Sequence, residues 1–196
     1  MEIIFLDEAD FKTTQWAGGT TTQLYISPQQ ATYADLNFDV RISSASVQKS
    51  PSTFTSLPNV HRKLMLLEGK IIINHQHKEF EQHLQLNKFD VTTFEGNWQT
   101  TSVGTCTDFN LMTTGNTKSD LSSLHLNKNK TYNLIVESEW KTLFLFVLSG
   151  NLTLNINNQH YVLKKNNLLI LKQYNTFSFP LHATQQSDVI ISKISI

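Results

Sequence analysis

Apolar and polar residues alternate with a period of two in several short stretches of the chain. Residues 38–43, 63–73, 144–156 and 160–163 are rich in Ile, Val, Thr and Phe, and clusters of Asn, Gly and Lys separate such stretches. This alternation is typical of strands with one buried face, because successive side chains of a strand point to opposite sides. Helical periodicity is hard to find anywhere. The sequence therefore predicts an all-β protein.

One short pattern occurs twice. Residues 64–69 and 144–150 each run an apolar strand into a glycine, and each is followed by another strand, a polar tip and a further strand. This repetition predicts two similar β-barrels or sandwiches in tandem. The polar stretch 113–120 has the composition of a linker. We therefore expect an N-terminal barrel at 1–120 and a shorter C-terminal half, packed against it, at 121–196.

Composition and charge argue against several classes of protein. The 16 Lys and Arg residues balance 16 Asp and Glu residues, so the basic excess of a nucleic-acid binder is missing. The longest apolar runs, such as 143–148, are far shorter than the roughly 20 residues that span a membrane. The acidic N-terminal segment 1–8 is unlike a signal peptide, and the single cysteine, Cys106, cannot form an internal disulfide. We expect a cytoplasmic protein with neither a nucleic acid nor a membrane as partner.

The segment 75–81, HQHKEFE, contains two histidines separated by one residue. On a strand, His75 and His77 would point the same way, and with Glu81 they could hold Fe, Mn or Zn. The same residues also suit a solvated hairpin tip, because residues 74–78 are polar and lie between two apolar stretches. We favour the hairpin and keep a metal-dependent oxygenase as an alternative.

Polar residues share one face of two short predicted strands. Arg41 and Ser43 alternate with apolar residues, and so do Asp108 and Asn110. These faces either contact solvent or line the lumen of a small barrel, where a few polar groups would fix a ligand. Arg62 shares a face with apolar residues of its strand and is either part of a surface salt bridge or a buried anion-binding group.

Residues 16–23, WAGGTTTQ, combine an indole, paired glycines and a row of hydroxyls. Glycines permit close backbone approach, and the hydroxyl of Thr21 could bind a polar ligand group. The lysine and helix of a phosphate-binding loop are missing. A simple turn that opens a β-hairpin is the alternative interpretation.

These segments, in this order, resemble the HutD/Ves family of bacterial proteins, which are linked to histidine utilisation and to stress. The family pattern combines a tryptophan before a glycine-rich turn, an Arg-x-Ser-x-Ala strand, a Leu-Glu-Gly turn and an Asp-Phe-Asn-x-Met strand. The resemblance covers residues 16–112, although the basic and amide residues that often follow the tryptophan are missing here. The matching positions are Trp16, Gly18, Gly19, Thr21 and Gln23, then Phe38, Arg41, Ser43 and Ala45, then Phe54, Pro58 and Arg62, then Leu67, Glu68 and Gly69, and finally Asp108, Phe109, Asn110, Leu111 and Met112.

The resemblance implies a bicupin, with two cupin-type barrels of the RmlC-like jelly-roll type in one chain. In ordinary cupins a metal-binding glutamate lies seven positions before the glycine of this turn. Here Arg62 takes that position in the first half and Leu143 in the second, while Gln99 takes the column of a later metal-binding histidine. None of these is a good ligand for a catalytic metal, so we expect neither metal nor other cofactor.

We therefore predict a metal-free module that binds a small carboxylate-bearing metabolite in the N-terminal barrel. Two guanidiniums suit a carboxylate because bidentate pairing is the strong form of that contact. The resemblance adds an acid of histidine or other amino-acid breakdown as ligand, a sensing or buffering role, and a homodimer. The expected ligand-binding residues are Arg41, Ser43, Arg62, Asp108, Asn110, Trp16, Thr21 and Gln99.

A metal-independent enzyme of the isomerase or epimerase type is a second possible function. Its base would be Asp108, but neighbouring arginines are expected to lower the pKa of that carboxyl and make it a weak base at neutral pH. No histidine is placed beside it by the sequence. Binding is therefore favoured over catalysis.

Overall fold

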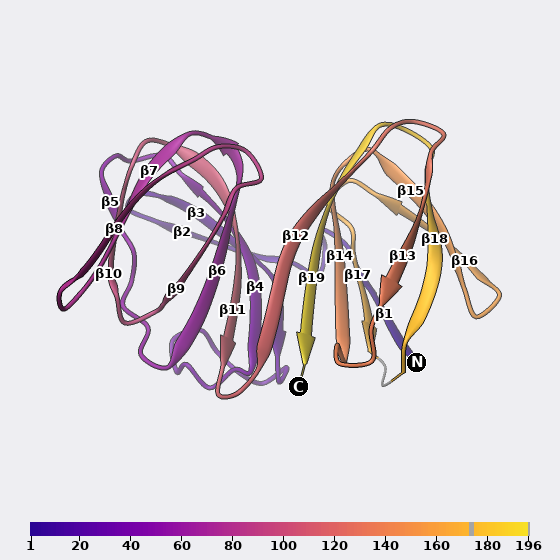
Figure 1. The fold of residues 1–196 in the computed structure, drawn as a ribbon, viewed down its shortest axis with the longest axis horizontal. Helices are drawn as coiled ribbons and strands as arrows, with labels where there is room; N and C mark the ends of the chain where they lie inside the picture. Colours follow the sequence, from indigo (N-terminus) through magenta and orange to yellow (C-terminus); the bar gives the residue numbers. More distant parts are fainter. Residues whose placement is uncertain (173–174, 196) are drawn as a thin grey trace. The chain divides into compact units, whose positions relative to one another are not determined.

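The computed structural model describes residues 1–172 and 175–195, and these residues form strands, turns and loops without any helix (Figure 1). The prediction of an all-β protein is confirmed. Because the described residues contain no helix, they also contain none that is long and apolar enough to cross a membrane.

The chain divides into two compact units. Phe11–Thr117 forms the N-terminal unit, and Met1–Asp10 joins Lys118–Ile196 in the C-terminal unit. The sequence placed residues 1–10 in the first barrel, and the structure differs there. Strand β1 (Glu2–Leu6) pairs antiparallel with β17 (Leu168–Lys172), so the start of the chain completes a sheet of the C-terminal unit. Local sequence patterns carry no signal for a pairing between residues so far apart.

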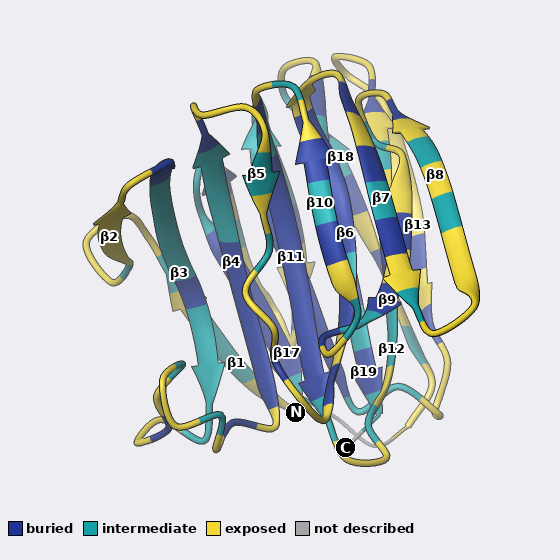
Figure 2. Cartoon of the chain, turned by 90° about the vertical axis from the view of Figure 1, so that its left-hand side faces the viewer, coloured by how far each residue is buried: buried dark blue, intermediate teal, exposed yellow. Residues whose placement is uncertain are grey.

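Two sheets build the N-terminal unit, and their apolar faces meet in a cluster that includes Leu64, Ile73 and Phe94. Figure 2 shows β2 exposed at one edge of the larger sheet and β8 exposed at the edge of the smaller one. The larger sheet has the order β2 (Lys12–Trp16), β3 (Gly19–Ser27), β4 (Val40–Val47), β11 (Cys106–Thr114), β6 (Val60–Gly69) and β9 (Val91–Glu95). The smaller sheet has the order β5 (Ser52–Thr53), β10 (Gln99–Val103), β7 (Ile71–His77) and β8 (Phe80–Leu86).

The C-terminal unit also contains two sheets, and its core consists of apolar side chains such as Leu143, Leu145 and Leu181. One sheet has the order β1, β17, β14 (Thr142–Ser149), β19 (Ser187–Ser195) and β12 (Lys118–Leu126). The other has the order β13 (Thr131–Val136), β18 (Phe177–Ala183), β15 (Asn151–Ile156) and β16 (Gln159–Lys164).

The repeated apolar-strand-to-glycine pattern forms the same turn in both units. Gly69 ends β6 with a φ of 89°, and Gly150 follows β14 with a φ of 79°. A Cβ atom at Gly69 would meet the carbonyl oxygen of Thr105, and one at Gly150 would meet that of Gln186. Glycine is therefore required at both turns, for its left-handed backbone and for lack of space.

Candidate ligand-binding cavity in the N-terminal barrel

A cavity of about 340 Å³ opens inside the N-terminal barrel. This volume is within the range of small-molecule sites. Of the eight residues predicted to bind a ligand, the structure brings seven together here: Trp16, Thr21, Arg41, Ser43, Arg62, Asp108 and Asn110. The other lining residues are Thr14, Tyr33, Ala45, Val47, Ser52, Thr53, Phe54, Thr55 and Met112.

Strand register explains why the polar side chains meet. On the paired strands β4 and β11, Ser43 lies opposite Asn110 and Arg41 lies opposite Met112. Met112 also lies opposite Arg62 on β6. Since alternate residues of a strand share a face, the inward positions of three neighbouring strands carry these groups. The predicted alternation is confirmed: intervening residues such as Ile42 are buried and do not line the cavity.

Arg41 is held by four neighbours and is only 5% exposed. Its Nε donates to Oε1 of Gln23 at 2.9 Å, and one terminal nitrogen donates to the hydroxyl of Ser43 at 2.9 Å and contacts the sulfur of Met112 at 3.9 Å. The guanidinium carbon lies 4.3 Å from the centre of the Tyr33 ring. Burial lowers the pKa of Arg41, which stays charged at neutral pH.

Arg62 is equally buried and has fewer partners. One terminal nitrogen donates to Oδ1 of Asn110 at 3.0 Å. Its guanidinium carbon lies 5.2 Å from the ring centre of Phe54 and 4.9 Å from that of Phe94. The buried Nε makes no hydrogen bond within the described part of the chain. Burial lowers the pKa of Arg62 to about 10, so the side chain is cationic at neutral pH.

Asn110 connects Arg62 to Asp108. Its amide oxygen accepts from Arg62, and its amide nitrogen donates to Oδ1 of Asp108 through a short hydrogen bond. Burial raises the pKa of Asp108 to about 7, although Arg62, the backbone N–H of Ala45 and Asn110 oppose the shift. The expectation that neighbouring arginines would lower this pKa is wrong, because removal of the carboxyl from water outweighs their attraction.

The cavity contains every arginine of the chain. Arg41 and Arg62 are the only two in the sequence, and the remaining basic residues counted with them are lysines. Within the described residues neither guanidinium forms an ion pair with a carboxylate. Asp108, with its pKa near neutrality, offsets at most one of the two charges. The cavity therefore has a net positive charge around pH 7.

Sequence reasoning missed the aromatic walls of the cavity and misplaced one residue. Tyr33 belongs to the irregular segment between β3 and β4, where no periodicity indicates which side chains point inward. Phe54 is part of the family resemblance but was not assigned to the site. Gln99, by contrast, is exposed and does not line the cavity. Alternation on β10 turns the next residue, Thr100, into the barrel and Gln99 away from it.

Comparison with known proteins places the chain in a family. The model of the HutD family matches residues 8–191. The chain belongs to the HutD family. No curated protein sequence matches it significantly.

Solved structures show that this HutD-family chain has the cupin fold. A conserved protein of unknown function from Pseudomonas aeruginosa PAO1 is 18% identical with a TM-score of 0.85, over 100% of both chains. HutD from Pseudomonas fluorescens SBW25 is 14% identical with a TM-score of 0.73, over 99% of this chain and 98% of that one. The vicilin of Solanum melongena is 9% identical with a TM-score of 0.70, over 98% of this chain and 84% of that one. The prediction of a bicupin is confirmed.

The cavity of this HutD-family chain does not fit the divalent metal ion implied by the cupin fold. Asp108 is the only carboxylate among its lining residues, which include no histidine. No group of three or more His, Cys, Asp or Glu side chains in the described residues could hold a metal ion. The guanidiniums of Arg41 and Arg62 would repel a cation at this place.

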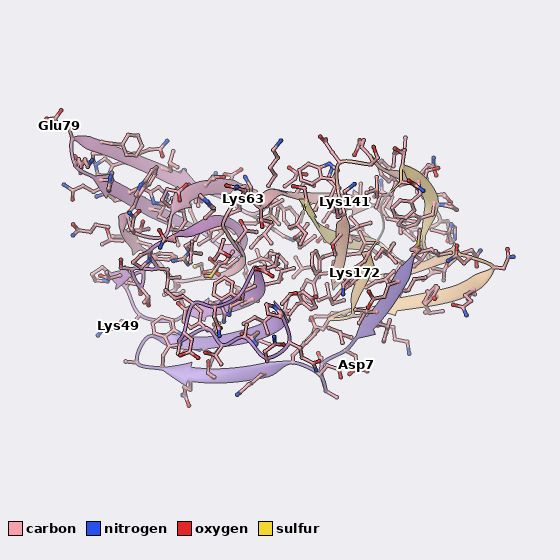
Figure 3. All side chains as sticks on the ribbon, turned by 90° about the horizontal axis from the view of Figure 1, so that it is seen from below. Asp7, Lys49, Lys63, Glu79, Lys141 and Lys172 are labelled. Carbon is pink, nitrogen blue, oxygen red and sulfur yellow. The ribbon has the colours of Figure 1, made fainter. Side chains whose placement is uncertain are left out.

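The two histidines that could have bound a metal have other partners. Both ring nitrogens of His75 lie 3.0 Å from threonine hydroxyls inside the barrel, so neither is available to an ion. His77 stacks on Trp98 at a centroid distance of 6.2 Å, and Glu81 pairs with an exposed histidine, His83. Figure 3 shows Glu79 at the outer tip of the β7–β8 hairpin, away from the barrel. The segment does form a hairpin with an exposed turn at Lys78 and Glu79, but the expectation of a solvated tip over residues 74–78 is wrong for His75, which alternation on β7 turns into the barrel core.

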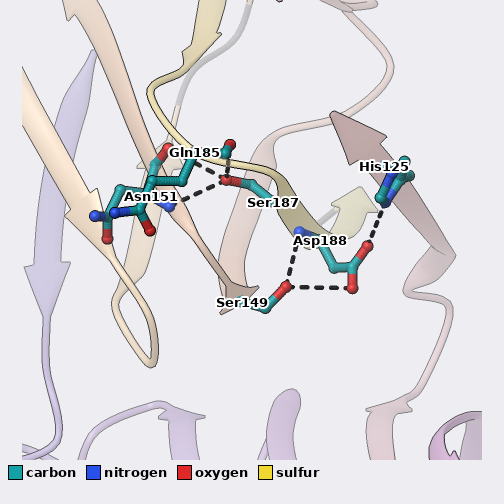
Figure 4. Close-up of polar contacts among 6 residues, drawn as sticks. All are labelled: His125, Ser149, Asn151, Gln185, Ser187 and Asp188. Atoms are coloured by element: carbon teal, nitrogen blue, oxygen red, sulfur yellow. Dashed lines mark hydrogen bonds and ion pairs between the residues drawn. The ribbon is translucent and has the colours of Figure 1, made fainter. Parts of the chain in front are cut away.

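Polar side chains of the C-terminal unit hold a turn together (Figure 4). The hydroxyl of Ser187 accepts from the backbone N–H of Asn151, and Asp188 receives a hydrogen bond from Ser149 and contacts His125 at 2.7 Å. The carboxylate lies between the serine and the histidine, whereas a Ser–His–Asp triad needs the histidine in the middle. This cluster fixes the strand ends around Gly150.

Proposed function

We propose that this HutD-family protein binds a small carboxylate-bearing metabolite in the N-terminal cavity. The observation that carries the proposal is that both arginines of the chain are buried in one cavity without an ion-paired carboxylate in the described residues. Two desolvated cations in one site are unfavourable unless a counter-charge joins them. A carboxylate is a suitable counter-ion because its two oxygens can accept two parallel hydrogen bonds from the N–H groups of a planar guanidinium.

Further features support an organic acid as the ligand. The Arg62 guanidinium lines the cavity and uses one terminal nitrogen to bond Asn110 within the described residues, and the rings of Tyr33 and Phe54 add apolar surface to the same cavity. Related cupins are described with similar ligands: an oxalate decarboxylase of Lactobacillus farciminis as a formate complex, and the Solanum melongena vicilin with different anionic ligands in structurally similar pockets. Occupancy of such a cavity by an acid from amino-acid breakdown would make the protein a sensor or buffer of that metabolite.

The test is a thermal-shift screen of small acids, including formate, urocanate and formylglutamate, followed by calorimetry. A ligand at about 100 times its Kd stabilises by about 2.7 kcal/mol, which corresponds to about 5–10 °C in Tm for a protein of this size. Arg62→Met and Arg41→Met should abolish the shift. Lys63→Met is the matched control, because Lys63 is the next residue on β6, and its Nζ contacts the exposed Thr93 hydroxyl at 3.3 Å.

Equal responses of wild type and Arg62→Met to every acid would overturn the proposal. A response lost in Lys63→Met as well as in Arg62→Met would mean that general surface charge, and not the cavity, attracts the acid.

Acid–base catalysis without a metal is a second candidate, and the raised pKa of Asp108 favours it. A carboxyl with a pKa of about 7 can both accept and donate a proton at neutral pH. Incubation in D2O of a bound acid with an α C–H on a saturated carbon, such as formylglutamate, should then exchange that proton for deuterium, and Asp108→Asn should stop exchange while retaining binding. No exchange with the wild type would exclude this reaction for the acid tested.

A further inference from the structure

His75 is a buried histidine that the proposed function does not use directly. Its side chain is fully buried in the N-terminal barrel, with Nδ1 3.0 Å from the hydroxyl of Thr100 and Nε2 3.0 Å from that of Thr92. Two threonines on two different strands thus fix the plane of the imidazole. Such a fully satisfied buried polar group is held rigidly.

The imidazole packs on a ring that also contacts a cavity arginine. The centroids of His75 and Phe94 are 4.4 Å apart at an interplanar angle of 32°. The same Phe94 ring lies 4.9 Å from the guanidinium carbon of Arg62, its cross-strand neighbour. A chain of direct contacts therefore runs from the threonines through His75 and Phe94 to Arg62.

Arg62 depends on this aromatic support more than Arg41 does. Among the described residues, Arg41 donates hydrogen bonds from two of its nitrogens to Gln23 and Ser43, whereas Arg62 donates a single one, to Asn110. The Arg62 guanidinium also lies over the rings of Phe54 and Phe94. Cation–π contacts of desolvated arginines contribute measurably to their position.

The charge state of His75 suits this packing. Burial and the nearby charge of Arg62 lower the pKa of His75 to about 4, so the imidazole is neutral around pH 7. One ring nitrogen then donates and the other accepts, and two threonine hydroxyls can serve both. A neutral ring packs on Phe94 without repelling the guanidinium.

We infer that His75 is a positioning residue for Arg62: the threonines fix the imidazole, the imidazole fixes Phe94, and Phe94 holds the guanidinium in the orientation that receives a carboxylate. The inference rests on the proposed function for the last of these steps only. The first steps can be measured without any ligand.

The ligand-free test is ¹⁵N NMR of the arginine side chains. The chain has two arginines, so two Nε–H signals are expected, and Arg62→Lys identifies which is which. His75→Gln keeps a polar group near the threonines but removes the ring from Phe94, and it should shift and broaden the Arg62 signal while leaving that of Arg41. Thr100→Val, a milder change of the same support, should shift the Arg62 signal in the same direction by less.

Ile73→Val is the matched control, since Ile73 is fully buried on the same strand, β7, and does not line the cavity. It should leave both arginine signals in place. An unchanged Arg62 signal in both His75→Gln and Thr100→Val would overturn the inference. So would an equal shift in Ile73→Val, because that result would indicate a general loosening of the core.

The functional test measures the affinity for formate by calorimetry. His75→Gln should weaken it at least fivefold, and Ile73→Val should leave it unchanged. Wild-type affinity in His75→Gln would overturn the inference while leaving the proposed function intact. No formate binding by the wild type, in contrast, would count against both the proposed function and the last step of the inference, and the NMR result would still decide the first steps.

Discussion

Asp108→Asn should change how the stability of the protein depends on pH. The carboxyl has a pKa of about 7 in the folded protein, against an ordinary value of 3.8. Between these values the folded state keeps a proton that the unfolded state releases, so stability falls as pH rises through this window. From about pH 5 to about pH 8, the wild type should lose about 3 kcal/mol of unfolding free energy relative to Asp108→Asn, at about 1.4 kcal/mol per pKa unit.

Urea unfolding at several pH values, followed by tryptophan fluorescence, measures this difference. His75 acts in the opposite sense: its pKa of about 4 lies below the ordinary 6.5, so its contribution rises with pH up to about pH 6.5. Subtraction of the variant from the wild type removes the histidine contribution, because both proteins contain it. Parallel curves for the wild type and Asp108→Asn across this range would refute the view that burial controls this carboxyl.

Three further predictions concern the cavity, its edge and the second core. Arg62→Leu should leave the unfolding free energy unchanged or raise it by about 1–4 kcal/mol in urea titrations, while carboxylate binding is lost; a marked destabilisation would contradict a buried, uncompensated charge. Gly18→Ala places a Cβ against the indole of Trp16, which is 42% exposed, so the substitution should displace the indole. The displacement is measured by the fluorescence of a variant in which Trp16 is the sole tryptophan, and an unchanged spectrum would contradict the contact. Leu145→Ala should cost about 2–5 kcal/mol, and Leu145→Met under about 1.5 kcal/mol, in thermal unfolding; equal costs would argue against tight packing at this buried position.

Much of the site could be predicted because it is built on regular strands. Period-two alternation places Arg41 with Ser43 and Asp108 with Asn110, and antiparallel pairing of β4 and β11 brings both rows to one wall. The sequence could not decide whether that wall faced solvent or a lumen. That choice depends on the segments that cover the polar side chains, such as the irregular one that holds Tyr33 and the short strand β5 with Phe54 after it, and no local pattern encodes the covering.

Other features of the structure could not be predicted from the sequence, for physical reasons. Tyr33 comes from an irregular segment without periodicity, and the pairing of β1 with β17 joins residues more than 160 positions apart. The pKa of Asp108 depends on how completely the carboxyl is removed from water, which a list of neighbouring charges does not contain. Gln99 was predicted to bind the ligand but is exposed, because an alignment error of one residue along a strand moves a side chain from the interior to the surface.

The contrast between the two barrels shows what distinguishes a site from a core in this fold. Arg62 and Leu143 stand at the same position, seven residues before the glycines that end their repeated strands. In its own unit Leu143 packs with aliphatic side chains in a continuous apolar core, whereas Arg62 lines a cavity. A guanidinium there needs a hydrogen-bonding amide, aromatic walls and space for a counter-ion, and the N-terminal barrel provides the first two through Asn110, Phe54 and Phe94. Within the described residues neither arginine forms an ion pair with a carboxylate, and the proposed acid would supply the missing counter-charge.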